Sequence, residues 1–155
     1  MNTPIDRTSI GDGPLTPEQA MYRENILDHY REPHNHGVVT TCDTQERGLN
    51  PLCGDEITVY LELSKDQKKV TDIHFSGHGC AISQAAMSML SDEIKNKPVS
   101  KIMNWDKEKV LALLGIPLSI VRIKCATLSL RTVQKALQKR AESKNQRSEL
   151  ENNSN

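Results

Sequence analysis

Apolar and polar residues alternate strictly over residues 56–63. Because successive side chains of a strand point to opposite faces, this alternation predicts a half-buried strand. A polar turn at 64–69 and a second apolar run at 70–75 follow, and so short a connection predicts an antiparallel hairpin. A weaker, more polar strand is predicted over 45–49. The apolar members of the alternating run are Ile57, Val59, Leu61 and Leu63.

Helical spacing of apolar residues appears before and after these strands. A first helix is predicted from Thr16 to about Glu32, because Thr16 and Gln19 fit a capping box and Pro17 suits the first helical position. Its expected inward face is formed by Tyr22, Ile26, Leu27 and Tyr30.

Three further helices are predicted in the second half of the chain. One runs from Cys80 to Lys95 with a wide apolar face. Another is capped by Asp106 and closed by Gly115, and a last one begins near Cys125.

Strands followed by helices predict an α+β fold, with a small three-stranded antiparallel sheet and helices packed on one face. Residues 1–15, rich in glycine and proline, are expected to form a flexible N-terminal lead. Residues 16–140 are expected to form the single domain. Residues 141–155 have almost nothing to bury, so a disordered tail is expected.

Composition narrows the classes of function. Twenty basic residues balance twenty acidic ones among 155, which gives no sign of a nucleic-acid or anionic-membrane surface. No apolar run is long enough for a transmembrane helix, and the start of the chain resembles neither a secretory signal nor a transit peptide, so the cytoplasm is expected. In such a reducing compartment, widely spaced cysteines are more often metal-binding or catalytic than disulfide-bonded.

Three of the four cysteines lie where predicted elements begin or end. Cys53 precedes a strand, and Asp55, two residues on, can point to the same side. Cys80 lies at a strand-to-helix junction, where the helix N-terminus favours a thiolate. Cys125 is placed at the start of the last helix. Lys124 beside it either lowers the pKa of the thiol through its charge or is simply a solvated lysine.

These three sulfurs and one carboxylate are the predicted metal ligands: Cys53, Asp55, Cys80 and Cys125. Four such ligands suffice for tetrahedral Zn²⁺, whereas three thiolates also suit an iron–sulfur cluster, whose usual set is four cysteines. The harder oxygen ligand should hold a cluster less firmly than a fourth sulfur, which suits a site that releases what it binds. Cys42 is interpreted as an incidental loop thiol, and no metal is assigned to the histidines.

Four segments resemble one known family. Asn50–Ile57, Gly77–Ser83 and Arg122–Leu128 resemble the three cysteine motifs of the U-type iron–sulfur cluster assembly scaffolds (IscU, SufU and the N-terminal domain of NifU), and Tyr22–Asn35 resembles that family's first helix and turn. The residues around these cysteines resemble those of SufU, because alanine and isoleucine follow Cys80 and lysine precedes the last cysteine. The interval between the second and third motifs is too short for the SufU insertion.

The resemblance implies a SufE/NifU-like fold and a scaffold rather than an ordinary enzyme. A cysteine desulfurase would deliver sulfur to Cys53 or Cys125 as a persulfide, iron would bind, and a transient [2Fe–2S] cluster on Cys53, Cys80 and Cys125 would pass to apo-protein acceptors. The alternative is a zinc-dependent sulfurtransferase partner of the desulfurase, with Zn²⁺ on the same four ligands. Zn²⁺ is also expected in the resting protein in either case. The sequence does not indicate which thiol accepts sulfur first or whether the protein forms a homodimer.

Overall fold

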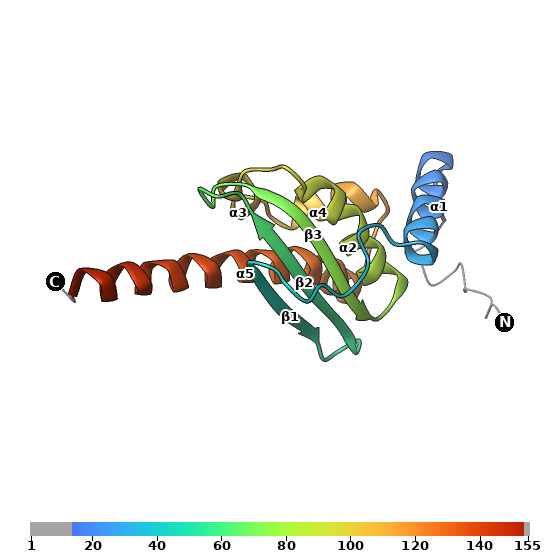
Figure 1. Cartoon of the computed structure of the whole chain (residues 1–155). Coiled ribbons are helices and arrows are strands. Elements are labelled where there is room, and N and C mark those ends of the chain that lie inside the picture. The colour runs from blue at the N-terminus through green and yellow to red at the C-terminus, as the bar shows by residue number, and fades with distance from the viewer. Residues whose placement is uncertain (1–13, 154–155) are drawn as a thin grey trace.

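The computed structural model describes residues 14–153 of the chain and confirms the α+β architecture. A three-stranded antiparallel sheet is covered on one face by helices, and a long last helix extends well beyond the sheet (Figure 1). In chain order the elements are α1 (Pro17–Arg31), β1 (Thr44–Asn50), β2 (Asp55–Leu63), β3 (Val70–His78), α2 (Ala81–Ile94), α3 (Val99–Met103), α4 (Lys107–Leu114) and α5 (Ile120–Asn153).

The sheet has the order β1-β2-β3, and β2 is its central strand. Val59 of β2 pairs with Glu46 on one side and with Phe75 on the other. The predicted alternation holds for Ile57, Val59 and Leu61, which are fully buried. It fails at Tyr60, which was expected on the polar face and is also buried, and Leu63 is only half-buried. Helix α5 packs across β1 and β2, and α2 packs on β3 and α5, so the core lies between the sheet and these two helices.

Local capping signals place the helices where the sequence indicates. Thr16 and Gln19 form the predicted capping box at the start of α1, with reciprocal hydrogen bonds of 3.0 and 3.2 Å. Cys80 is the N-cap of α2, and Asp106 is the N-cap of α4. Gly115 ends α4 in the left-handed conformation.

The last helix differs from its prediction at both ends. It begins at Ile120 rather than near Cys125, because Ser119 Oγ accepts the Arg122 N–H at 3.3 Å and so caps the helix one turn earlier. The expectation of a disordered tail from residue 141 is wrong for the part that is described. The helix continues through Asn153 although every residue of this stretch is exposed. Alanine, glutamate, lysine, glutamine and arginine have high helix propensity, and extending an existing helix avoids the cost of nucleation.

Two further points concern a helix that the sequence did not predict and the predicted N-terminal lead. The short helix α3 was not predicted; its five residues are too few to show helical periodicity. The predicted N-terminal lead lies almost entirely outside the described residues. Among the helices of residues 14–153, none is both long and apolar enough to cross a membrane.

Candidate metal centre

Four elements meet at one end of the sheet and bring together the residues that the sequence analysis selected. Cys53 lies on the tight turn between β1 and β2, and Asp55 is the first residue of β2. Cys80 caps α2, and Cys125 lies in the second turn of α5 rather than at its start. Residues up to 72 positions apart in the chain thus become neighbours.

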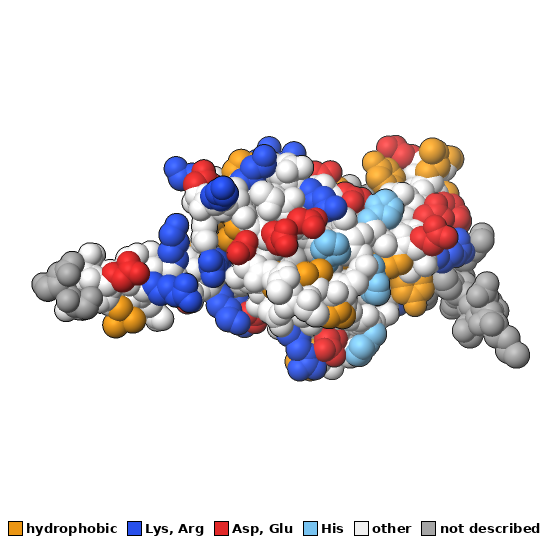
Figure 2. All heavy atoms as spheres, in the orientation of Figure 1, with side chains coloured by type: hydrophobic (Ala, Val, Ile, Leu, Met, Phe, Trp, Pro, Cys, Tyr) orange, Lys and Arg blue, Asp and Glu red, His pale blue; other side chains and the backbone are white. Residues whose placement is uncertain are grey.

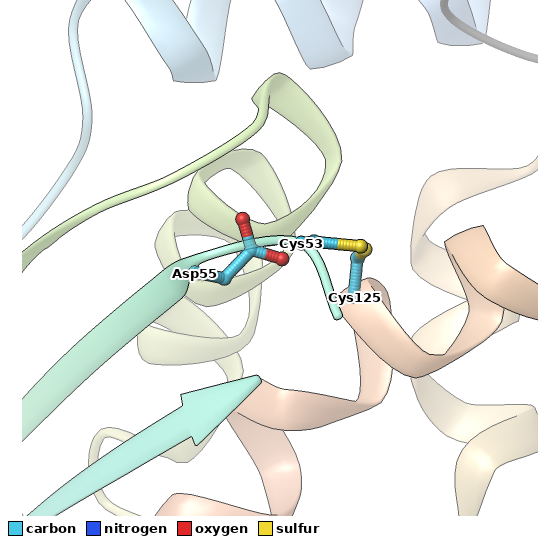
Figure 3. A group of neighbouring side chains, drawn as sticks. All are labelled: Cys53, Asp55 and Cys125. Atoms are coloured by element: carbon cyan, nitrogen blue, oxygen red, sulfur yellow. The ribbon is translucent and has the colours of Figure 1, made fainter. Parts of the chain in front are cut away.

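The tightest group consists of Cys53, Asp55 and Cys125. One sulfur or carboxylate oxygen from each lies within 4.8 Å of the others, and the two sulfurs are 3.0 Å apart as free thiols. Figure 3 shows the two sulfurs side by side, with a carboxylate oxygen of Asp55 turned toward them. Cys80 lies at the edge of this group, with its sulfur 3.9 Å from Asp55 Oδ2.

Asp55 joins the group to the start of α2. Its side chain is almost fully buried, at 1% exposure, and Oδ1 accepts the Cys80 backbone N–H at 2.8 Å. The other oxygen, Oδ2, therefore remains available on the side of the thiols. Gly79 permits this contact, because a Cβ at that position would collide with the Asp55 carboxylate and with Ser83 Oγ.

Cys80 is held by the first turn of α2. Its sulfur accepts the Ser83 N–H at 3.5 Å, and Ser83 Oγ donates to the Cys80 carbonyl at 3.1 Å. Ser83 is fully buried and was not singled out from the sequence, although its position three residues after a helix cap is the usual signal for such a contact.

The electrostatics of Cys125 contradict one expectation. Of the two expectations for Lys124, a lowered pKa of Cys125 is not found: burial raises the pKa of this thiol, and the adjacent Cys53 and Asp55 raise it further. The Lys124 side chain is exposed to solvent. A thiol in this environment is protonated until a cation arrives, and a bound metal reverses the balance by favouring the thiolate.

The donor set fits a soft or borderline cation. Sulfur and carboxylate oxygen are the ligands of Zn²⁺ and, with sulfur predominating, of iron in iron–sulfur clusters. The three thiols differ in solvent exposure: Cys53 is exposed, Cys80 is half-buried and Cys125 is buried. The site is therefore anchored in the core and accessible from one side, an arrangement that permits both uptake and release.

The remaining cysteine and the histidines lie apart from this group. Cys42 is next to Asp43, which hydrogen-bonds with Leu61 and Leu63, at the end of β2 opposite Asp55. Three histidines lie near α1 or at the end of β3: His78 pairs with Glu56 at 3.2 Å, His34 with Asp92 at 2.6 Å, and His29 with Ser88 at 2.7 Å. Several histidines are visible on the face drawn in Figure 2.

Fold and site together define a class of protein: a small α+β domain that presents cysteine thiols and a carboxylate near the ends of its elements. The pattern that defines the NifU-like N-terminal domain matches residues 21–147. The chain belongs to the NifU-like N-terminal domain family.

Individual relatives are named either as a sulfurtransferase or as cluster assembly scaffold proteins. The chain is 34% identical over 136 residues to the zinc-dependent sulfurtransferase SufU of Bacillus subtilis, covering 77% of this chain and 90% of that one. It is 30% identical over 116 residues to the iron–sulfur cluster assembly scaffold protein IscU of Aquifex aeolicus, covering 75% of this chain and 73% of that one.

Solved structures agree with this assignment. The crystal structure of SufU from Fervidobacterium islandicum AW-1 superposes with a TM-score of 0.63 at 28% identity, covering 74% of this chain and 94% of that one. The N-terminal NifU-like structure from Brucella abortus gives a TM-score of 0.65, with 82% and 99% coverage, and at 18% identity it supports the fold alone.

Proposed function

We propose that this protein is a scaffold on which an iron–sulfur cluster is assembled and from which the cluster is transferred to acceptor proteins. The observation that carries the proposal is the convergence of Cys53, Asp55 and Cys125, with Cys80 at the edge, on one accessible site. Membership of the NifU-like N-terminal domain family and similarity to a protein named as an IscU scaffold support it.

Sulfur is proposed to enter as a persulfide from a cysteine desulfurase. Cys53 and Cys125 are the candidate acceptors, and the exposure of Cys53 favours it as the point of entry. Its thiolate would attack the outer sulfur of the desulfurase persulfide, forming a new S–S bond here and releasing the desulfurase thiolate. The neighbouring Cys125 sulfur, 3.0 Å away, is close enough to receive the same sulfur in a second exchange.

Cluster formation then requires electrons and iron from outside. Each persulfide sulfur needs two electrons to become sulfide, and oxidation of Fe²⁺ to Fe³⁺ supplies only one per iron. A reductant must therefore provide the remainder. The cluster, as cargo, is proposed to rest on Cys53, Cys80 and Cys125, with Asp55 completing the ligands. Three thiolates and one weaker oxygen ligand favour a cluster that can leave.

The rim of the site suits docking of partner proteins. Leu52, next to Cys53, is 70% exposed, and Ile120 and Val121, about one turn before Cys125, are 78% and 51% exposed. Exposed aliphatic side chains beside a reactive site are typical of a protein interaction surface. We assign this rim to the desulfurase and to the acceptors, which must approach the same thiols. The free thiols suit a reducing compartment such as the cytoplasm.

The test is anaerobic reconstitution with ferrous iron, cysteine, a cysteine desulfurase and dithiothreitol. Visible absorption should show a [2Fe–2S] cluster, and transfer should restore the spectrum of an apo-ferredoxin. The matched control is the Cys42→Ser variant, which removes a thiol from the opposite end of β2. Failure of the unmodified protein to form any cluster would refute the proposal. Size-exclusion chromatography of the loaded protein would show whether a homodimer forms around it.

Similarity to the Bacillus subtilis sulfurtransferase favours a second candidate function. In that case Zn²⁺ would occupy the same ligands. A thiolate would accept the outer sulfur of the desulfurase persulfide, with release of the desulfurase thiolate, and would pass this sulfur on without building a cluster. That alignment is 136 positions long, but 77% of this 155-residue chain is only about 119 residues. The relative therefore has additional residues within the matched region that this chain lacks. Stimulation of the desulfurase by the zinc-loaded protein, with no cluster formed, would decide for the sulfurtransferase.

A further inference from the structure

We propose that Asn50 is a positioning residue of the metal centre: its side-chain amide donates a hydrogen bond to the sulfur of Cys125, and its backbone closes the turn that carries Cys53. This assignment deepens the proposed function and rests on it. Asn50 is the last residue of β1, is 5% exposed and pairs across the sheet with Asp55.

The orientation of the amide follows from its two partners. Asn50 Oδ1 accepts the backbone N–H of Leu52 at 3.3 Å, and an N–H can be satisfied only by the oxygen end of the amide. The nitrogen end must therefore point the other way, and Nδ2 lies 3.7 Å from Cys125 Sγ. This distance suits an N–H···S hydrogen bond, because sulfur is a larger acceptor than oxygen.

The backbone of Asn50 organises the other cysteine. Its carbonyl accepts the N–H of Gly54 at 2.9 Å and that of Cys53 at 3.3 Å, which closes the turn after β1. One residue thus holds Cys53 through its backbone and Cys125 through its side chain. These two sulfurs come from distant parts of the chain, and their spacing depends on this connection.

The donor also has an electronic consequence. In the metal-free protein Cys125 Sγ donates to Cys53 Sγ at 3.0 Å, and both thiols lose their protons when a metal binds the two sulfurs. The amide N–H of Asn50 cannot be lost in this way and still stabilises charge on the sulfur. Hydrogen bonds to ligand sulfurs are among the factors that set the reduction potential of a cluster, and such outer contacts also orient the ligands.

Two substitutions separate this role from simple support of the turn. Asn50→Asp keeps an oxygen for the Leu52 N–H but replaces the donor with a second acceptor. Asn50→Ala removes both contacts and introduces no new ligand. The matched control is Asn25→Asp, the same chemical change at an exposed position on α1. All three are compared with the unmodified full-length chain.

The readouts are the sulfur-to-metal charge-transfer bands of the Co²⁺-loaded protein, the reduction potential of the reconstituted cluster, and the thermal midpoint of the metal-free protein. Without the donor the sulfur is more electron-rich, so both Asn50 variants should move the bands to lower energy and the potential to more negative values. Asn50→Ala should also weaken Co²⁺ binding by about 10–100-fold, the usual effect of losing a contact that orients a ligand. Asn25→Asp should change neither spectrum nor potential.

Bands and potential that stay at their unmodified values in both Asn50 variants would overturn the assignment, even if the thermal midpoint falls, because a structural role alone predicts that pattern. The Co²⁺ experiment needs neither desulfurase nor acceptor. If the protein shows the Co²⁺ charge-transfer bands but transfers no cluster, the scaffold function alone is refuted. Normal transfer with bands unmoved by the Asn50 substitutions would refute the role of Asn50 alone.

Discussion

Replacing Gly79 by alanine should damage the site in a way that can be separated from ordinary backbone strain. Gly79 has φ +157°, a conformation that side-chain-bearing residues rarely adopt, and an added Cβ would lie 3.0 Å from Asp55 Cγ and 2.7 Å from Ser83 Oγ. Asp55 would have to move, and its 2.8 Å hydrogen bond from the Cys80 N–H would be lost. Gly37 provides the control, since its φ is similar at +149° and a Cβ there meets nothing within 4 Å.

The structure gives the size of the expected difference. The backbone penalty, about 1–3 kcal/mol, should be shared by both alanine variants. Loss of a hydrogen bond to a charged carboxylate adds about 1.5–3 kcal/mol in Gly79→Ala alone. For a domain of this size each kcal/mol lowers the thermal midpoint by ~2–4 °C, so Gly79→Ala should melt roughly 3–12 °C below Gly37→Ala.

Urea unfolding of the two metal-free variants gives the free-energy difference, and Co²⁺ titration reports the site. Gly37→Ala should bind Co²⁺ as the unmodified protein does, whereas Gly79→Ala should bind it more weakly, because the Asp55 carboxylate is displaced. Equal free energies of unfolding and equal Co²⁺ affinities in the two variants would refute the contact between Asp55 and the start of α2.

Four further outcomes are expected. Asp55→Cys should slow cluster transfer to apo-ferredoxin by about tenfold or more, equivalent to ~1.4 kcal/mol of firmer holding, because a fourth sulfur replaces the weaker oxygen ligand. Cys42→Ser should leave cluster assembly unchanged, as measured by visible absorption. Burial, with a smaller effect of His34, lowers the pKa of His29 below 6.5 in the folded protein. The unfolded chain therefore binds more protons, and the free energy of unfolding decreases as the pH falls through 6.5. The His29→Asn substitution should reduce this loss of stability in thermal melts at low pH. Deleting residues 141–155 should leave the thermal midpoint within about 2 °C, since the described part of this stretch buries nothing.

Each of these has a contradicting result. Transfer from Asp55→Cys at the unmodified rate would show that the oxygen ligand does not govern release. Loss of assembly in Cys42→Ser would place that thiol in the pathway. An unchanged pH dependence in His29→Asn would assign the acid sensitivity to other groups, and a large fall in midpoint after the deletion would mean that the exposed part of α5 has a partner.

Much of the fold was predictable because its signals are local. The alternation around Val59 and the capping box of Thr16 and Gln19 each involve neighbours within a few residues, and both are present in the structure. The start of α5 was misplaced although Ser119 carried a capping signal, because isoleucine and valine after it are equally typical of a strand. The exposed part of α5 carries no burial pattern in the sequence, because its order comes from helix propensity and from the extension of an existing helix.

The sequence alone determined which side chains are the candidate ligands and that each of these cysteines lies near the end of an element, since both follow from motifs and short-range pattern. Only the tertiary structure decided that these ends meet, that Cys125 is buried while Cys53 is exposed, and that Asn50 contacts both of them. The reason is that the separation of Cys53 and Cys125 depends on how α5 packs across β1 and β2. Packing between distant segments leaves no periodic trace in the chain, so their distance can be read only from the folded protein.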